Sequence, residues 1–167
     1  MAKENRKIGR ELTLFHALLY KLVSIPFNIL NFVLAGRLPP FGRVCIVVEE
    51  QDHYLVIEHT AHEITFPGGF MRWREHPVQA AQREGEEETG LHLRIDDIIG
   101  YYSNISARFD RLSPLTICYT GEVVGGELSS SAEGQPRWLD ESELHSKLDA
   151  SYRSMLDDYL HYHSKNA

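Results

Sequence analysis

Residues 67–91 read PGGFMRWREHPVQAAQREGEEETGL, and this stretch decides both the fold and the chemistry of the chain. Three acidic residues, Glu84, Glu87 and Glu88, are spaced so that a helix brings them to one side. Like charges at this spacing repel each other by about 0.2–0.5 kcal/mol per pair. They also lie toward the C-terminal end of the predicted helix, where the helix dipole disfavours negative charge. Stability gives no reason for the cluster, whereas a hard cation such as Mg²⁺ binds carboxylate oxygens and then phosphates.

The fixed residues of this stretch resemble the Nudix box, from Gly69 to Leu91. Five residues separate Gly69 from Glu75, and seven more lead to Arg83 and the acidic run that follows it. One position departs from the pattern, because Gly85 stands where the family usually carries an aliphatic residue. Agreement at so many positions is far more specific than a lone glycine motif.

The resemblance, which the flanking segments extend over roughly residues 43–148, implies an α/β protein with the Nudix fold, a mixed β-sheet sandwiched between α-helices. It also implies a hydrolase that uses Mg²⁺ or Mn²⁺ to cleave the pyrophosphate bond of a nucleoside diphosphate linked to another group. The expected partner is therefore a small-molecule nucleotide derivative and not a nucleic-acid polymer. Fold and box together do not choose the substrate.

The resemblance also assigns roles by position. The implied metal ligands are box residues with the backbone of the glycine pair: Glu84, Glu87, Glu88, Gly68 and Gly69. Glu84 or Glu87 would also activate the attacking water, and which of them is the base stays open. Arg83 would orient the neighbouring carboxylates, and Glu75 would hold Arg83 in place. Bound metal ions would neutralise the charge of the pyrophosphate and acidify the water.

Candidates outside the acidic run have two interpretations each. Glu133 lies in a polar loop and either joins the metal site or is an exposed glutamate. Arg72, Arg74 and Arg108 either bind substrate phosphates or are surface charges. One alternative function is a membrane-associated hydrolase of a nucleotide-linked precursor, and the other is a non-catalytic nucleotide-binding or sensor domain. Such proteins usually lack box glutamates or the arginine, and none is missing here.

Composition narrows the class of protein. The length of 167 residues suits one main domain, and the formal charge of −7 disfavours a protein that coats nucleic acid. Residues 1–35 contain five basic and two acidic side chains, a net charge of +3, which leaves −10 for the remainder. Cys45 and Cys118 lie in strand-like runs and form no metal-binding pattern. We therefore expect two core thiols and a cytoplasmic location.

The N-terminal segment predicts a separate element, so we divide the chain into an amphipathic helical extension with a linker, residues 1–40, and a Nudix hydrolase domain, residues 41–167. Polar residues of this helix fall on one narrow stripe, which leaves a wide apolar face. Pro26 is expected to kink or divide the helix. The arm packs on its own domain or on the second subunit of a homodimer, or residues 11–35 make a peripheral membrane contact that would make the enzyme membrane-associated.

Hydrophobic patterns predict the remaining elements. Strands are expected at residues 44–48, 54–58, 98–106 and 115–124, the first two as a hairpin. The box helix is expected to start near Pro77 and to stop at Gly90. A turn at residues 125–126, a polar loop at 129–136, a helix capped by Asp140 and a last helix capped by Ser151 complete the prediction.

Overall fold

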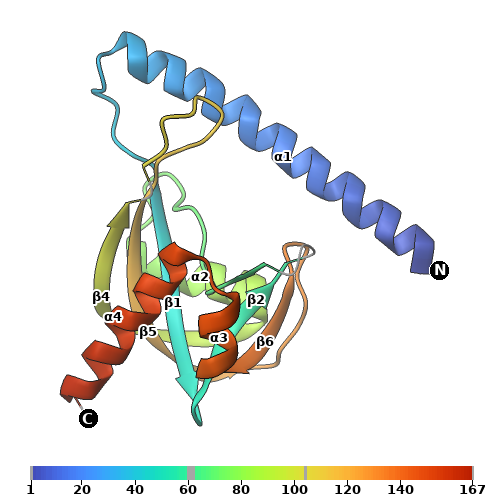
Figure 1. The fold of residues 1–167 in the computed structure, drawn as a ribbon, viewed down its shortest axis with the longest axis vertical. Helices are drawn as coiled ribbons and strands as arrows, with labels where there is room; N and C mark the ends of the chain where they lie inside the picture. Colours follow the sequence, from blue (N-terminus) through green and yellow to red (C-terminus); the bar gives the residue numbers. More distant parts are fainter. Residues whose placement is uncertain (1, 60–62, 104, 167) are drawn as a thin grey trace. The chain divides into compact units, whose positions relative to one another are not determined.

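The computed structural model describes residues 2–59, 63–103 and 105–166, which form two compact units (Figure 1). The first unit comprises Met1–Phe41 and Asn104–Pro114, and the second comprises Gly42–Ser103 and Leu115–Ala167. The division of the chain at residue 40 stays a prediction.

The second unit is built on a six-stranded mixed sheet with the order β3-β2-β1-β5-β4, in which β6 pairs with β2. Its strands are β1 (Gly42–Glu50), β2 (His53–Glu58), β3 (Ile64–Thr65), β4 (Leu91–Ser103), β5 (Leu115–Gly126) and β6 (Gln135–Asp140). β1 and β5 run parallel, and the other pairs are antiparallel, including the predicted hairpin of β1 and β2. A strand in the middle of the sheet is buried on both faces, which explains the unbroken apolar run of β1.

Helices cover both faces of this sheet (Figure 1). α2 (Pro77–Thr89) packs on one face, and α3 (Glu141–Lys147) and α4 (Ala150–Asn166) cover the other. The predicted architecture, a mixed sheet between helices with an additional N-terminal helix, is confirmed.

Alternate side chains of β1 serve the two cores, because successive residues of a strand point to opposite faces. Val44 and Ile46 belong to the cluster of buried residues under α2. Cys45 and Val47 belong to the cluster under α3 and α4, together with Cys118. Both cysteines are free and buried, as predicted.

In the first unit, α1 (Ala2–Val33) runs through Pro26 without a break, so of the two predicted effects, a kink or a division, the division is wrong and the kink stays a prediction. A proline removes one backbone hydrogen bond, which the carbonyl four residues earlier would otherwise accept. That carbonyl belongs to Leu22, a residue that is largely exposed, so solvent can replace the lost bond. No helix in the described part of the chain is long and apolar enough to cross a membrane.

The strand predicted at residues 98–106 begins much earlier. β4 starts at Leu91, directly after the glycine that ends α2, and stops at Ser103. Position 104 lies outside the described residues. The pairing of β4 with β5 shifts register between Ile95 and Ile98, and such bulges break the alternation from which strands are predicted.

Two boundaries near the C-terminus also differ from the prediction. β6 starts at Gln135, inside the predicted polar loop. Asp140 caps α3 as predicted, since its side chain accepts a hydrogen bond from the Glu143 N–H. The last helix is capped by Asp149 and not by Ser151, because the Asp149 carboxylate accepts from the Tyr152 N–H at 3.0 Å.

The predicted turn at residues 125–126 is instead the end of β5, where Gly125 pairs with His92 and Gly126 with Leu91. Gly126 has a φ of 87°, and a Cβ there would lie 2.4 Å from the Gly90 carbonyl oxygen. A Cβ at Gly125 would meet only the His92 ring, at 3.6 Å. The strand therefore needs a glycine at only one of the two positions, where it passes the end of α2.

We expect Gly126→Ala to lower the free energy of unfolding by about 2–4 kcal/mol, from the strained φ and the backbone clash together. Gly125→Ala is the matched control and should leave stability unchanged or raise it slightly. Urea denaturation of both variants measures the difference, and equal stabilities would contradict the close approach of β5 to Gly90.

Candidate active site

Local capping fixes where the box helix begins and ends. Pro77 occupies the first turn, as predicted, and the His76 side chain accepts a hydrogen bond from the Val78 N–H. The Gln79 side chain accepts from the His76 N–H at 3.4 Å, which completes a capping box. At the other end Gly90 has a φ of 74°, the left-handed conformation that was expected.

The side of α2 that faces the sheet is made of small residues. Ala81 is fully buried, and a Cβ at Gly85 would lie 2.5 Å from Leu93 and 3.3 Å from Ile46. The departure from the family pattern at Gly85 therefore belongs to a close contact between the helix and the sheet. Two acidic side chains of the helix, Glu84 and Glu88, contact the loop of residues 67–69 that precedes it, which we call the glycine loop.

The glycine loop lies along β1. The Val44 N–H donates to the Gly69 carbonyl and the Ile46 N–H to the Pro67 carbonyl, both at 2.9 Å. A Cβ at Gly68 would lie 2.2 Å from the Val44 carbonyl oxygen, and Gly68 has a φ of 147°. A Cβ at Gly69 would lie 2.4 Å from a Glu84 carboxylate oxygen. Gly68 is required, because the clash there is with backbone, whereas a Cβ at Gly69 would displace the end of the Glu84 side chain.

Arg83 is the centre of the acidic cluster. Its Nε and Nη2 donate to the two carboxylate oxygens of Glu75 at 2.7 and 2.8 Å. Its Nη1 lies 2.6 Å from Glu84 Oε1 and 3.1 Å from Glu87 Oε2. Nη2 also donates to the Phe70 carbonyl at 3.2 Å, which links the helix to the glycine loop. One guanidinium group thus holds three carboxylates in a fixed arrangement.

These contacts shift the titration of both partners. Hydrogen bonds from Arg83 lower the pKa of Glu75 to about 2. Hydrogen bonds with Glu75 are the main reason why the pKa of Arg83 is raised. Burial raises the pKa of Glu84, although Arg83 opposes this effect. The Glu75–Arg83 pair is therefore charged at every pH at which the protein would work.

Glu88 and Glu133 form a second acidic contact. The Glu88 carboxylate is buried and accepts a hydrogen bond from the Gly68 N–H at 2.8 Å. Burial raises the pKa of Glu88 well above its usual range, and a hydrogen bond with the Glu133 side chain adds to the rise. The polar loop thus brings Glu133 to the box helix, 45 residues after Glu88 in the chain.

The donor groups fit a hard cation in their chemistry. In the parts of the chain that are described, no three His, Cys, Asp or Glu side chains are gathered closely enough to hold an ion together. Glu84 and Glu87 point to Arg83, which balances their charge. Side-chain rotation is the change that would bring these carboxylates to an ion beside Glu88. Divalent charge would then favour the ionised carboxylates that burial disfavours.

The three candidate phosphate-binding arginines lie in different places. Arg72 contacts the cluster, because its Nη2 lies 2.9 Å from Glu87 Oε1. The guanidinium of Arg74 lies over the Trp73 ring, 4.2 Å from its centre. Arg108 belongs to the first unit, where it pairs with Asp110 at 2.8 Å.

Sequence reasoning missed two residues that support the cluster. His59 Nδ1 lies 2.8 Å from the Glu133 carbonyl oxygen and Nε2 lies 2.9 Å from Thr65 Oγ1, so the histidine fixes the loop that carries Glu133. Arg43 donates from Nη2 to the Tyr152 hydroxyl at 2.9 Å. Burial works to lower the pKa of Arg43, but Tyr152 and Glu88 are among the groups that outweigh it. The sequence feature that could have singled out Arg43 is its position in β1, a charged residue directly before the apolar run that begins at Val44.

A model of the NUDIX domain family matches residues 39–159, which is most of the chain and includes the whole acidic cluster. The chain belongs to the Nudix family. Family membership makes it one of the Nudix hydrolases, which act on small nucleotide derivatives and generally use divalent metal ions.

Three relatives place it within this family. An ADP-ribose pyrophosphatase of Methanocaldococcus jannaschii is 27% identical over 121 residues, 70% of each chain. A MutT-like protein of Streptomyces ambofaciens is 28% identical over 127 residues, 73% of this chain and 79% of the other. A solved Nudix hydrolase of Nitrosomonas europaea superposes with a TM-score of 0.64 at 26% identity, covering 72% of this chain and 88% of its own.

Glu75→Gln should lower the free energy of unfolding by about 2 kcal/mol at neutral pH, because Arg83 loses a charged partner. The pKa of Glu75 is depressed to about 2 in the folded protein, against about 4.3 for a free glutamate. Its stabilisation is thus complete above about pH 4.3 and fades as the pH falls toward 2.

Denaturation of the wild type and the variant, from neutral pH down to about pH 3, should show this difference shrinking. Glu86→Gln is the control, since Glu86 is exposed on the same helix and its one ion-pair partner in the described part of the chain is His92. A loss of stability that did not change with pH would contradict the assignment.

Proposed function

We propose that this Nudix protein is a Mg²⁺- or Mn²⁺-dependent pyrophosphohydrolase, which cleaves the pyrophosphate bond of a nucleoside diphosphate linked to another group. The observation that carries the proposal is the arrangement around Arg83, which holds Glu75, Glu84 and Glu87 against the glycine loop. A relative named as an ADP-ribose pyrophosphatase supports the substrate class. The two free, buried cysteines suit the reducing cytoplasm in which such nucleotides occur.

The metal ion would be held by the carboxylates of Glu84, Glu87, Glu88 and Glu133 with the backbone of Gly68 and Gly69. Support comes from the contacts of Glu88, which accepts from the Gly68 N–H and shares a hydrogen bond with Glu133. When bound, the ion supplies positive charge that neutralises the pyrophosphate and acidifies a water molecule. A buried carboxylate beside a second acid is unfavourable without such charge, and the burial of Glu88 next to the exposed Glu133 favours a metal site over a solvated acidic surface.

The remaining roles follow from the contacts of the side chains. Glu84 or Glu87 accepts the proton of the attacking water, and Arg83 keeps both carboxylates in position with Glu75 behind it. Arg72 binds a substrate phosphate, because it already contacts a carboxylate of the cluster and its side chain is 64% exposed. Arg74 and Arg108 are proposed to assist in the same way as exposed guanidinium groups.

Glu87→Gln should lower turnover by a factor of about 10² or more, because it removes a metal ligand or the base while the fold stays intact. Glu86→Gln is the matched control: it removes the same charge from the preceding position of the helix and should retain activity. Both side chains are exposed, at 50% and 57%.

The assay is a panel of nucleoside diphosphate derivatives, with ADP-ribose among them, scored for released nucleoside monophosphate with Mg²⁺, with Mn²⁺ and with a chelator. Cleavage that is unaffected by the chelator, or full activity of Glu87→Gln, would contradict the proposal. Absence of cleavage across the panel, together with calorimetric binding of nucleotide, would instead indicate the non-catalytic alternative.

Arg72→Ala should raise KM by about tenfold with a smaller change in kcat, if the arginine binds the ground state and the transition state alike. Arg94→Ala is the control, because Arg94 on β4 pairs with Asp96 of the same strand and with Glu122 of the neighbouring β5. An unchanged KM in the Arg72 variant would show that its contact with Glu87 has no role in substrate binding.

A further inference from the structure

Side chains on the polar side of α1 contact a loop of the same chain. Asn28 Nδ2 donates to the carbonyls of Phe109 and Arg111, at 2.9 and 2.8 Å. The Tyr20 hydroxyl accepts from the Leu112 N–H at 3.0 Å. These contacts join the helix to the loop of residues 105–114 within the first unit. The helix therefore packs through its polar side.

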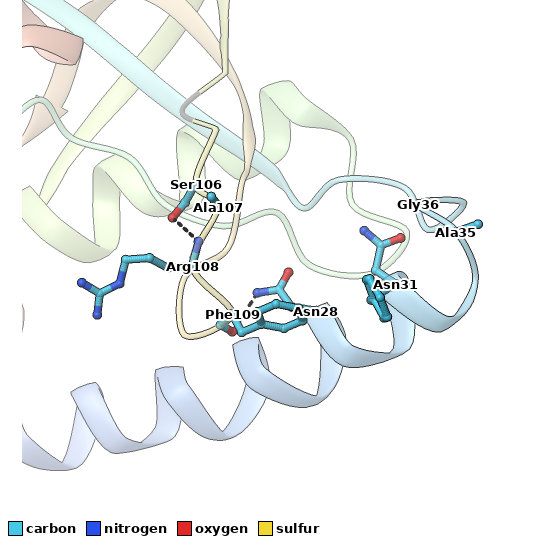
Figure 2. A pocket seen from close by; sticks show the side chains of 9 residues that line it. Asn28, Asn31, Ala35, Gly36, Ser106, Ala107, Arg108 and Phe109 are labelled. Carbon is cyan, nitrogen blue, oxygen red and sulfur yellow. Dashed lines mark hydrogen bonds between the residues drawn. The ribbon is translucent and has the colours of Figure 1, made fainter.

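The same side of α1 is the better covered one. Ser24 is 0% exposed, although it is polar. Figure 2 shows the amide group of Asn28 beside Phe109, in the loop that also carries Ser106 and Arg108. Helix and loop border an open hollow of about 480 Å³. An amphipathic helix that packs on its own protein would normally bury the opposite, apolar side.

The apolar half of α1, centred on Leu22 and Ile29, is left exposed. At 100° per residue it covers about half of the circumference. From position 18 to position 33 each residue on it is aliphatic, proline or phenylalanine. Its large side chains are between 38% exposed, at Ile25, and 76% exposed, at Phe32. An apolar surface this continuous marks an interaction site.

We propose that the apolar half of α1 inserts into the interface of an anionic lipid bilayer, with the helix lying along the membrane surface. The charge of the sequence selects this occupant. Lys3, Arg6, Lys7 and Arg10 precede the apolar half, and residues 1–35 carry +3 against −10 for the rest of the chain. Anionic headgroups attract such a basic segment, while the apolar side chains enter the acyl boundary.

A second copy of the chain fits this surface less well. Two helices that pair along their length bury a narrow seam, about two positions in every seven. The apolar half of α1 is wider than that seam, so a helix pair would leave much of it in water. A bilayer covers the whole half at once. The polar stripe, which already contacts the loop, would face away from the lipid.

The test uses the full chain and vesicles of phosphatidylcholine, with and without about 30 mol% phosphatidylglycerol. We expect flotation with the anionic vesicles and a partition coefficient at least about tenfold lower with the neutral ones. Leu22→Gln/Ile29→Gln should lower partition to the anionic vesicles by about tenfold or more. The control is Val124→Gln/Leu128→Gln, which removes two exposed apolar side chains from the second unit and should change nothing.

Replacing Lys3, Arg6, Lys7 and Arg10 by Gln should abolish the preference for anionic vesicles and leave the weak binding to neutral ones. The proposal fails if the wild type does not float, or if the Leu22/Ile29 variant floats as well as the wild type. It also fails if light scattering shows a dimer without lipid that this variant dissociates, since the second copy would then be the occupant. Hydrolase activity and circular dichroism of each variant show that the fold is retained.

Discussion

The site depends on the ion pairs that the guanidinium group of Arg83 makes with its neighbouring carboxylates. This group pairs with three carboxylates and also reaches the Phe70 carbonyl, so one side chain connects the box helix with the glycine loop. Without this positive charge, Glu84 and Glu87 would repel each other toward the negative end of the α2 dipole. The close packing of Gly85 on the sheet then sets the distance between the sheet and the acidic residues of α2. The same short helix, α2, therefore carries the acidic residues and packs against the sheet.

The sequence predicted best those features that depend on local chemistry. The start of α2 at Pro77, its end at Gly90 and the buried run of β1 all follow from rules that act over a few residues. The pairing of Arg83 with Glu75 was implied by the family resemblance and not by a local rule, and the structure shows the contact.

Features that depend on contacts between distant segments were harder to predict. The bulges in β4 hid the first half of that strand, because they break the alternating pattern. The sequence predicts a turn at Gly126, whereas its positive φ allows β5 to pass close to the backbone of Gly90. Asp149 and Ser151 are both good capping residues, and only the structure shows which one accepts the bond. His59 supports Glu133 from 74 residues away, a relation that spacing does not reveal.

The two cysteines have a practical consequence. Cys45 and Cys118 face each other on the parallel pair β1 and β5, and both are buried. A hydrogen bond with Cys45, more than burial, raises the pKa of the Cys118 thiol well above its usual value. Little reactive thiolate of Cys118 is therefore present, and Cys45 is shielded by burial, so both should resist maleimide reagents in the folded protein. One cysteine introduced on α1 could then carry a fluorophore or spin label on the natural background, without first replacing either residue.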